Sequence, residues 1–162
     1  MAYTAAWGAA CFPLGRLLKR LPLNWERPPF AGMAWERGGA VYEGLGIRCW
    51  KDIAPDVSRW FPGIVPRKAF SGMVTAQKAR DMLAETCVAE LTHLILCLTG
   101  LVMLPLWPGA GGLVYYGIYA LLGNLPFIAI QRYNRPRYRQ LLEKAERRER
   151  RLGDARTDTV EQ

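Results

Sequence analysis

The single histidine of the chain, His93, lies among strong helix formers and has Glu85 and Glu90 close by. On an α-helix, which turns about 100° per residue, Glu85 lies at 0°, His93 at roughly 80° and Glu90 at roughly 140°. The two carboxylates therefore bracket the imidazole on one face. A histidine oriented by a carboxylate is a general base suited to a hydroxyl group. The spacing predicts catalytic roles for His93, Glu90 and Glu85; the alternative is a hydrogen-bonded histidine that only packs helices together.

The same stretch has the Glu90-x-x-His93 spacing of carboxylate-bridged di-iron helices. Such a site needs a second Glu-x-x-His, and the chain has only one histidine. The cysteines show neither CxxC nor zinc spacing, and they are Cys11, Cys49, Cys87 and Cys97. We therefore expect no metal and no cofactor.

A second group of polar residues follows an apolar run that ends at Ile130. On a continuous helix Asn124, Gln131 and Arg135 lie within roughly 20° of one another. An amide and a guanidinium on one stripe can bind a sugar, a phosphate or an acyl carbonyl. The alternative is that the arginines anchor the chain to lipid phosphates, which leaves the amides unexplained. The predicted substrate-binding residues here are Asn124, Gln131, Arg132, Tyr133, Asn134, Arg135 and Arg137.

A third candidate is the run Trp50-Lys51-Asp52. Lys51 suits an anionic group and Asp52 suits the cap of a turn. Spacing by itself favours a structural role for these three residues.

The elements that must position these groups follow from the distribution of charge. From Leu94 to Ile130 the chain has no Asp, Glu, Lys or Arg. Thr75 is a good helix cap, and a helix over 76–104 would be about 43 Å long, more than the ~30 Å of a bilayer core. A turn at 107–112 and a second span over 113–130, kinked at Pro126, complete a hairpin. The predicted fold is an all-α integral membrane protein with two main spans, about 76–104 and 113–130.

The rest of the chain is assigned to one membrane domain, 1–145, followed by a charged, partly disordered tail, 146–162. Residues 1–23 contain a short N-terminal apolar segment, Met1–Leu14, that lies in or on the membrane. Residues 24–74 form an aromatic-rich interfacial region, 75–130 the transmembrane hairpin and 131–145 a basic motif. Because Lys and Arg flank the hairpin on both sides and its turn has none, both flanks and the C-terminus are predicted to be cytoplasmic.

The formal net charge of +8 does not indicate nucleic acid, because the basic residues flank apolar runs instead of forming a known nucleic-acid-binding motif. Anionic lipid is the better-matched partner. We expect a membrane protein, and the oligomeric state is left open.

Three stretches are informative together: WERGGAVYEGLGIRCWKDIAP, AETCVAELTH and NLPFIAIQRYNRPRYRQLL. In this order they resemble the glycosyl-4,4'-diaponeurosporenoate acyltransferases of staphyloxanthin-type carotenoid biosynthesis, over about residues 30–145. The resemblance implies a small membrane enzyme that esterifies a glucose hydroxyl of a glycosylated carotenoid with a fatty acyl group. All the candidate residues above fall within the resembling stretches.

The leading hypothesis is a membrane-bound O-acyltransferase of a bacterial cytoplasmic membrane, in which His93 is the general base and Glu90 or Glu85 holds its tautomer. Arg132, Asn134 and Arg135 would bind the acyl donor or stabilise the oxyanion. The expected partners are a lipid-like glycosylated acceptor and a fatty acyl donor such as acyl-CoA. The alternative is a small non-catalytic membrane protein that acts as a lipid-binding subunit or assembly partner.

Overall fold

The computed structural model describes residues 13–51 and 73–160, with side chains up to Asp154. Within these ranges every regular element is helical, beginning with a short helix at residues 13–18. The elements that follow are η1 (Ala34–Gly39), α2 (Ala40–Gly44), α3 (Ile47–Trp50), α5 (Ala76–Gly100), α6 (Met103–Leu106), α7 (Ala110–Gly123) and α8 (Leu125–Val160). The N-terminal apolar segment falls almost wholly outside the described residues, as does Asp52.

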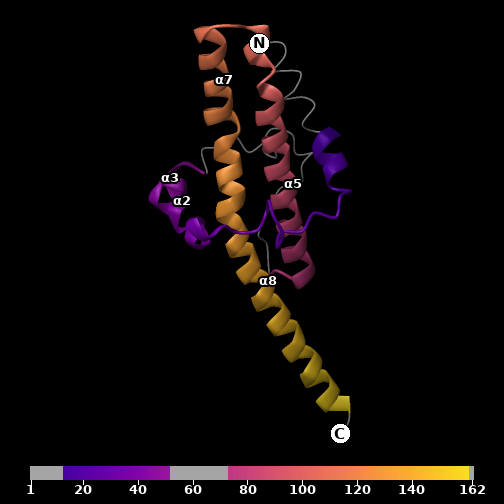
Figure 1. The fold of residues 1–162 in the computed structure, drawn as a ribbon. Helices are drawn as coiled ribbons and strands as arrows, with labels where there is room; N and C mark the ends of the chain where they lie inside the picture. The colour runs from indigo at the N-terminus through magenta and orange to yellow at the C-terminus, as the bar shows by residue number, and fades with distance from the viewer. Residues whose placement is uncertain (1–12, 52–72, 161–162) are drawn as a thin grey trace.

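Two antiparallel arms make up the hairpin, with α5 as one arm and α7 continuing into α8 as the other (Figure 1). The predicted cap of α5 is confirmed, because the Thr75 hydroxyl accepts a hydrogen bond from the Lys78 amide at 3.2 Å. α5 ends at Gly100, four residues before the predicted end. Pro105 has no N–H to donate to the carbonyl of Leu101, so the helix breaks there and the short α6 follows.

The second arm is broken at Asn124, not merely kinked at Pro126 as predicted. Asn124 has non-helical φ and ψ of −129° and −49°, and α8 starts with the next residue. Pro126 has no N–H to donate to the carbonyl of Leu122, which interrupts the helical hydrogen bonds. The side-chain amide of Asn124 donates to a different carbonyl, that of Tyr119, at 3.0 Å. The break thus turns an amide side chain inward, and α8 runs on to Val160 as one long helix.

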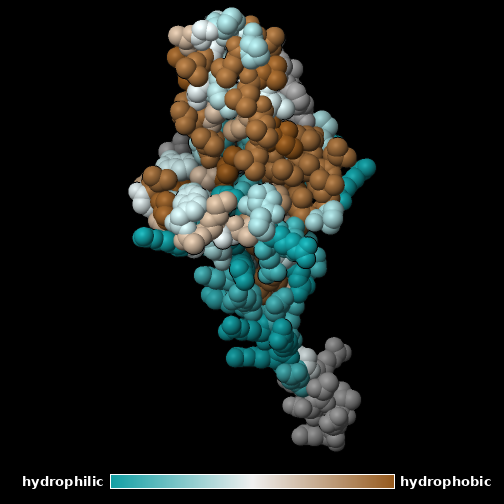
Figure 2. All heavy atoms as spheres, viewed as in Figure 1, coloured by the Kyte–Doolittle hydropathy of each residue, from teal (hydrophilic) through white to brown (hydrophobic). Residues whose placement is uncertain are grey.

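The apolar half of the hairpin is exposed. On α7, Leu113, Val114, Ile118, Leu121 and Leu122 are each between 56% and 72% exposed. Both arms are long and apolar enough to cross a membrane, and only 11% of the most apolar window of the second arm is buried. A soluble core helix would be mostly buried, so this surface suits lipid. Figure 2 shows it as a brown upper half above a teal lower half. The predicted hairpin of two long apolar helices is confirmed.

Residues 24–51 pack around the polar half of the hairpin. Trp25 packs against a core formed between α5 and α8, whereas Trp50 packs beside Tyr133 on α8. Trp35 lies next to Tyr42, with ring centroids 6.2 Å apart. The aromatic side chains of the described part of this region therefore form separate contacts and no common cluster, and the aromatic-rich interfacial region stays a prediction.

Candidate functional site

The centre of the polar half is Glu90, which is fully buried on α5. Its two oxygens accept hydrogen bonds from two arginines of α8: Arg132 Nε lies 2.7 Å from Oε1 and Arg135 Nη2 lies 2.6 Å from Oε2. A buried carboxylate is stable only with such compensation, and hydrogen bonds between ions are the strongest in proteins. These hydrogen bonds to Glu90 therefore join α5 to α8 in the polar half of the hairpin.

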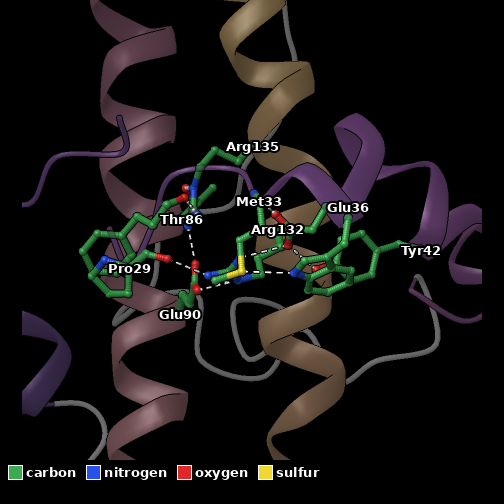
Figure 3. A network of polar contacts seen from close by, with 10 residues as sticks. Pro29, Met33, Glu36, Tyr42, Thr86, Glu90, Arg132 and Arg135 are labelled. Atoms are coloured by element: carbon green, nitrogen blue, oxygen red, sulfur yellow. Dashed lines mark hydrogen bonds and ion pairs between the residues drawn. The ribbon is translucent and has the colours of Figure 1, made fainter. Parts of the chain in front are cut away.

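Arg132 also binds η1 and the segment before it, as Figure 3 shows. Its Nη1 donates to Glu36 Oε1 at 2.8 Å and its Nη2 donates to the carbonyl of Pro29 at 2.6 Å. Glu36 in turn accepts hydrogen bonds from the hydroxyl of Tyr42 and from the amide of Met33. One guanidinium thus connects three segments that are far apart in the sequence.

Arg135 completes the network from the next turn of α8. Its Nη1 donates to the carbonyl of Phe30 at 2.5 Å and its Nε donates to the hydroxyl of Thr86 at 3.0 Å. The two guanidiniums face two carboxylates, those of Glu36 and Glu90, so the charges of this four-residue network cancel.

The hydrogen-bond network changes the pKa of Glu36, which lies at its edge. Burial by itself raises the pKa of Glu36, but hydrogen bonds from Arg132, Tyr42 and the Met33 amide outweigh burial and hold this pKa below its ordinary value. The hydroxyl of Tyr42 shows the complementary effect, because burial and the adjacent Glu36 carboxylate raise its pKa. Glu36 is therefore ionised, and Tyr42 a neutral donor, at neutral pH.

His93 lies one turn beyond Glu90 toward the apolar end of α5. Its Nδ1 is 3.0 Å from the side-chain oxygen of Asn124, and its ring stacks on Phe127 with centroids 4.7 Å apart and planes at 6°. Because the Asn124 Nδ2 donates to the carbonyl of Tyr119, the amide oxygen must face the histidine. Nδ1 then carries the proton, and Nε2 keeps a lone pair that can accept one.

The described contacts give the Nδ1 atom of His93 an amide partner, Asn124, where a carboxylate, Glu90 or Glu85, was predicted. Glu90 is held by Arg132 and Arg135, since two cations attract a carboxylate more strongly than a neutral imidazole does. Glu85 lies toward the surface, with an oxygen 3.5 Å from Lys19 Nζ. The group that orients the imidazole is an amide from the break in the second arm.

The remaining predicted binding residues divide into two sets. Tyr133 is buried on the face of α8 toward α2 and α3, with the Arg137 guanidinium 3.5 Å and Lys51 Nζ 5.7 Å from its ring centroid. Trp50 donates from Nε1 to the carbonyl of Leu45 at 3.1 Å. These four side chains pack α2 and α3 against α8.

Gln131 and Asn134 are half-buried, and the side chain of neither forms a hydrogen bond with a residue that the structure describes. On a helix they lie roughly 40° and 20° from Phe127, the residue that stacks on His93. Their amides are therefore on the side of α8 that leads from His93 to the polar half.

Sequence analysis missed three side chains of the network, those of Glu36, Tyr42 and Thr86. Thr86 shares a helical face with Glu90, and this spacing was a usable signal. Glu36 had no such signal, because its partner Arg132 is 96 residues away in the chain.

A cleft with a volume of about 270 Å³ opens between η1 and α8, beside the network. Arg132 and Arg135 line its inner wall together with Glu36 and Phe30. Arg37 from η1 and Arg139 from α8 line it as well, whereas His93 does not. His93 is therefore outside the cleft, whereas Arg132, Arg135 and Glu36 of the network form part of its lining.

Comparison with known proteins gives a consistent result. Residues 26–144 match the family model described as glycosyl-4,4'-diaponeurosporenoate acyltransferase. The chain is 38% identical over 147 residues to the protein of that name from Staphylococcus aureus strain N315, covering 88% of this chain and 87% of the relative. Its counterparts from strains USA300 and NCTC 8325 give the same identity and coverage. No solved structure matches the chain.

Proposed function

Because the chain belongs to the glycosyl-4,4'-diaponeurosporenoate acyltransferase family, we propose that it transfers a fatty acyl group to a sugar hydroxyl of a glycosylated carotenoid or a related glycolipid. The predicted family is confirmed, and its members are acyltransferases by name. The proposed location is a bacterial cytoplasmic membrane with the charged C-terminal helix on the cytoplasmic side, because basic residues concentrate there. The exposed apolar faces of the hairpin would lie against the acyl and polyene chains of the substrates.

The observation that carries the mechanism is the contact between His93 and Asn124. With Nδ1–H held by the amide oxygen, the unprotonated Nε2 is the atom that accepts the proton of the sugar hydroxyl. The hydroxyl oxygen then forms a bond to the acyl carbonyl carbon, and the bond from that carbon to the donor's leaving group breaks. The proton on Nε2 passes to the leaving group, which restores the neutral imidazole.

An amide partner has a specific consequence for this step. Asn124 fixes the tautomer and the ring orientation, but it carries no negative charge to stabilise an imidazolium. The stacked ring of Phe127 restricts the imidazole further. The amides of Gln131 and Asn134, on the same side of α8 as Phe127, are suited to hold the sugar hydroxyls of the acceptor. Glu90, Arg132 and Arg135 would act as positioning residues that keep α5 and α8 in register.

The test uses His93→Ala and Asn124→Ala in the full chain, expressed in cells that supply a glycosylated carotenoid. Ester formation is measured by mass spectrometry and normalised to membrane-inserted protein. We expect His93→Ala to lower the rate by about 10²- to 10⁴-fold, the range for loss of a general base. Asn124→Ala, which leaves the base in place but unoriented, should cost about tenfold.

Cys97→Ala is the matched control, because Cys97 lies one turn beyond His93 on the same helix and is also half-buried. It should retain its rate. Full acylation by membrane-inserted His93→Ala would show that the imidazole is not the base.

A further inference from the structure

The cleft between η1 and α8 carries more positive charge than the network beside it requires. Arg132 and Arg135 are balanced by Glu36 and Glu90. Arg37 and Arg139 also line the cleft, and neither forms an ion pair with a residue in the described part of the chain. Two guanidiniums are therefore left over at one small opening, which gives it an unbalanced charge of +2.

The backbone presents one of these arginines in an unusual way. Arg37 has φ and ψ of 46° and 46°, in the left-handed region that side chains other than glycine seldom occupy. Gly38 and Gly39 follow with φ of 64° and 100°. An added Cβ on Gly39 would lie 3.2 Å from Arg137 Nη1 and 3.6 Å from the carbonyl oxygen of Tyr133. The glycine thus lets η1 sit directly on α8 and brings Arg37 to the same opening as Arg139.

The size of the cleft limits what it can hold. A volume of about 270 Å³ is slightly below that of pockets for whole drug-sized ligands, roughly 300–1,000 Å³. It suits a compact anionic group more than a complete acyl carrier. Guanidiniums bind phosphate oxygens in paired hydrogen bonds, and arginine is the preferred residue for this purpose.

The position of the cleft fits the donor better than the acceptor. It lies at the polar end of the hairpin, and Glu90, to which its inner arginines bind, precedes His93 on α5 by three residues. A donor whose phosphate occupies the cleft can extend past the network toward His93 and lay its acyl chain on the apolar arms. In Figure 3 Arg132 lies between α5 and the segment that carries Glu36.

We propose that the cleft bounded by Arg37, Arg139, Arg132 and Arg135 binds the phosphate ester of the acyl donor. The assignment of that ligand as donor rests on the proposed acyl transfer, whereas phosphate binding itself does not. The shared chemistry is a phosphate ester joined to an acyl group, which either a coenzyme A thioester or a phospholipid supplies.

The test measures binding without transfer, on the full chain in an uncharged maltoside detergent that contains no phosphate. Isothermal titration calorimetry with coenzyme A and, separately, with dihexanoyl phosphatidate compares the wild type with the double variant Arg37→Ala/Arg139→Ala. Loss of the two charge-assisted contacts should raise the Kd by at least about tenfold. Arg147→Ala is the matched control, because Arg147 is an exposed arginine of α8 outside the cleft, and its Kd should stay within about twofold of the wild type.

The outcomes distinguish a coenzyme A thioester from a phospholipid as the ligand, and they test the phosphate site separately from the proposed acyl transfer. Binding of coenzyme A that the double variant loses supports a thioester donor, and the same pattern with phosphatidate supports a phospholipid donor. Equal affinity in all three proteins, or no binding of either probe to the wild type, overturns the cleft assignment. Acyl transfer that proceeds normally in the double variant also overturns it and leaves the proposed function intact. Phosphate binding in a protein that transfers no acyl group leaves the anion site standing and refutes the acyltransferase.

Discussion

Replacing Glu90 by glutamine tests whether this carboxylate stabilises the hairpin or acts on the imidazole. The substitution keeps the shape of the side chain but removes its charge, leaving two buried guanidiniums with Glu36 as their one remaining carboxylate. Removing one partner of a buried ion pair costs about 3–5 kcal/mol. In a chain of this size each kcal/mol lowers the Tm by about 2–4 °C, so we expect a fall of roughly 6–20 °C.

The assay is thermal unfolding of the purified full chain in detergent, followed by acylation measured well below the Tm of the variant. Glu85→Gln is the matched control on the same helix, because Glu85 faces Lys19 near the surface and such pairs contribute about 1 kcal/mol or less. We expect Glu90→Gln to melt early and yet to retain most of its activity at low temperature. If Glu90→Gln has the Tm of the wild type and transfers no acyl group, the structural role is refuted and Glu90 acts in the reaction.

Two further predictions concern the segment that contacts α8. Because the pKa of Glu36 is lowered in the folded protein, its contribution to stability is present above the ordinary carboxyl value of 4.5 and is lost as the pH falls through the lower, folded value. The Tm of the wild type should therefore exceed that of Glu36→Gln near neutral pH, and the two curves should converge in acid; a constant difference would contradict the assignment. Gly39→Ala should lower the free energy of unfolding by about 1–3 kcal/mol, because its φ is 100° and the new Cβ would meet α8. Gly44→Ala is the control, because a Cβ on this residue of α2 would meet open space, and it should not lower the Tm. If both variants lose the same stability, the close approach of Gly39 to α8 is not the cause.

The sequence by itself determined the apolar two-helix hairpin and the family. The uncharged run from Leu94 to Ile130 predicted the hairpin, and Thr75 marked the start of its first arm, because hydrophobic length and helix capping are local properties. The motifs around His93 and Asn124 likewise identified the acyltransferase family. Their polar residues were marked as candidates because amides and carboxylates are costly inside an apolar stretch.

Only the tertiary structure decided which of these groups meet. Helical spacing placed Glu90 near His93, but two arginines from the other arm hold that carboxylate, and charge decides the competition where water is excluded. Asn124 orients the imidazole because the second arm breaks at this residue, whereas only a kink at Pro126 was predicted. Arg37 and Arg139 lie about a hundred residues apart in the chain and share a cleft because Gly39 lets η1 sit against α8. Pairings over such separations depend on how the arms pack, which no local pattern records.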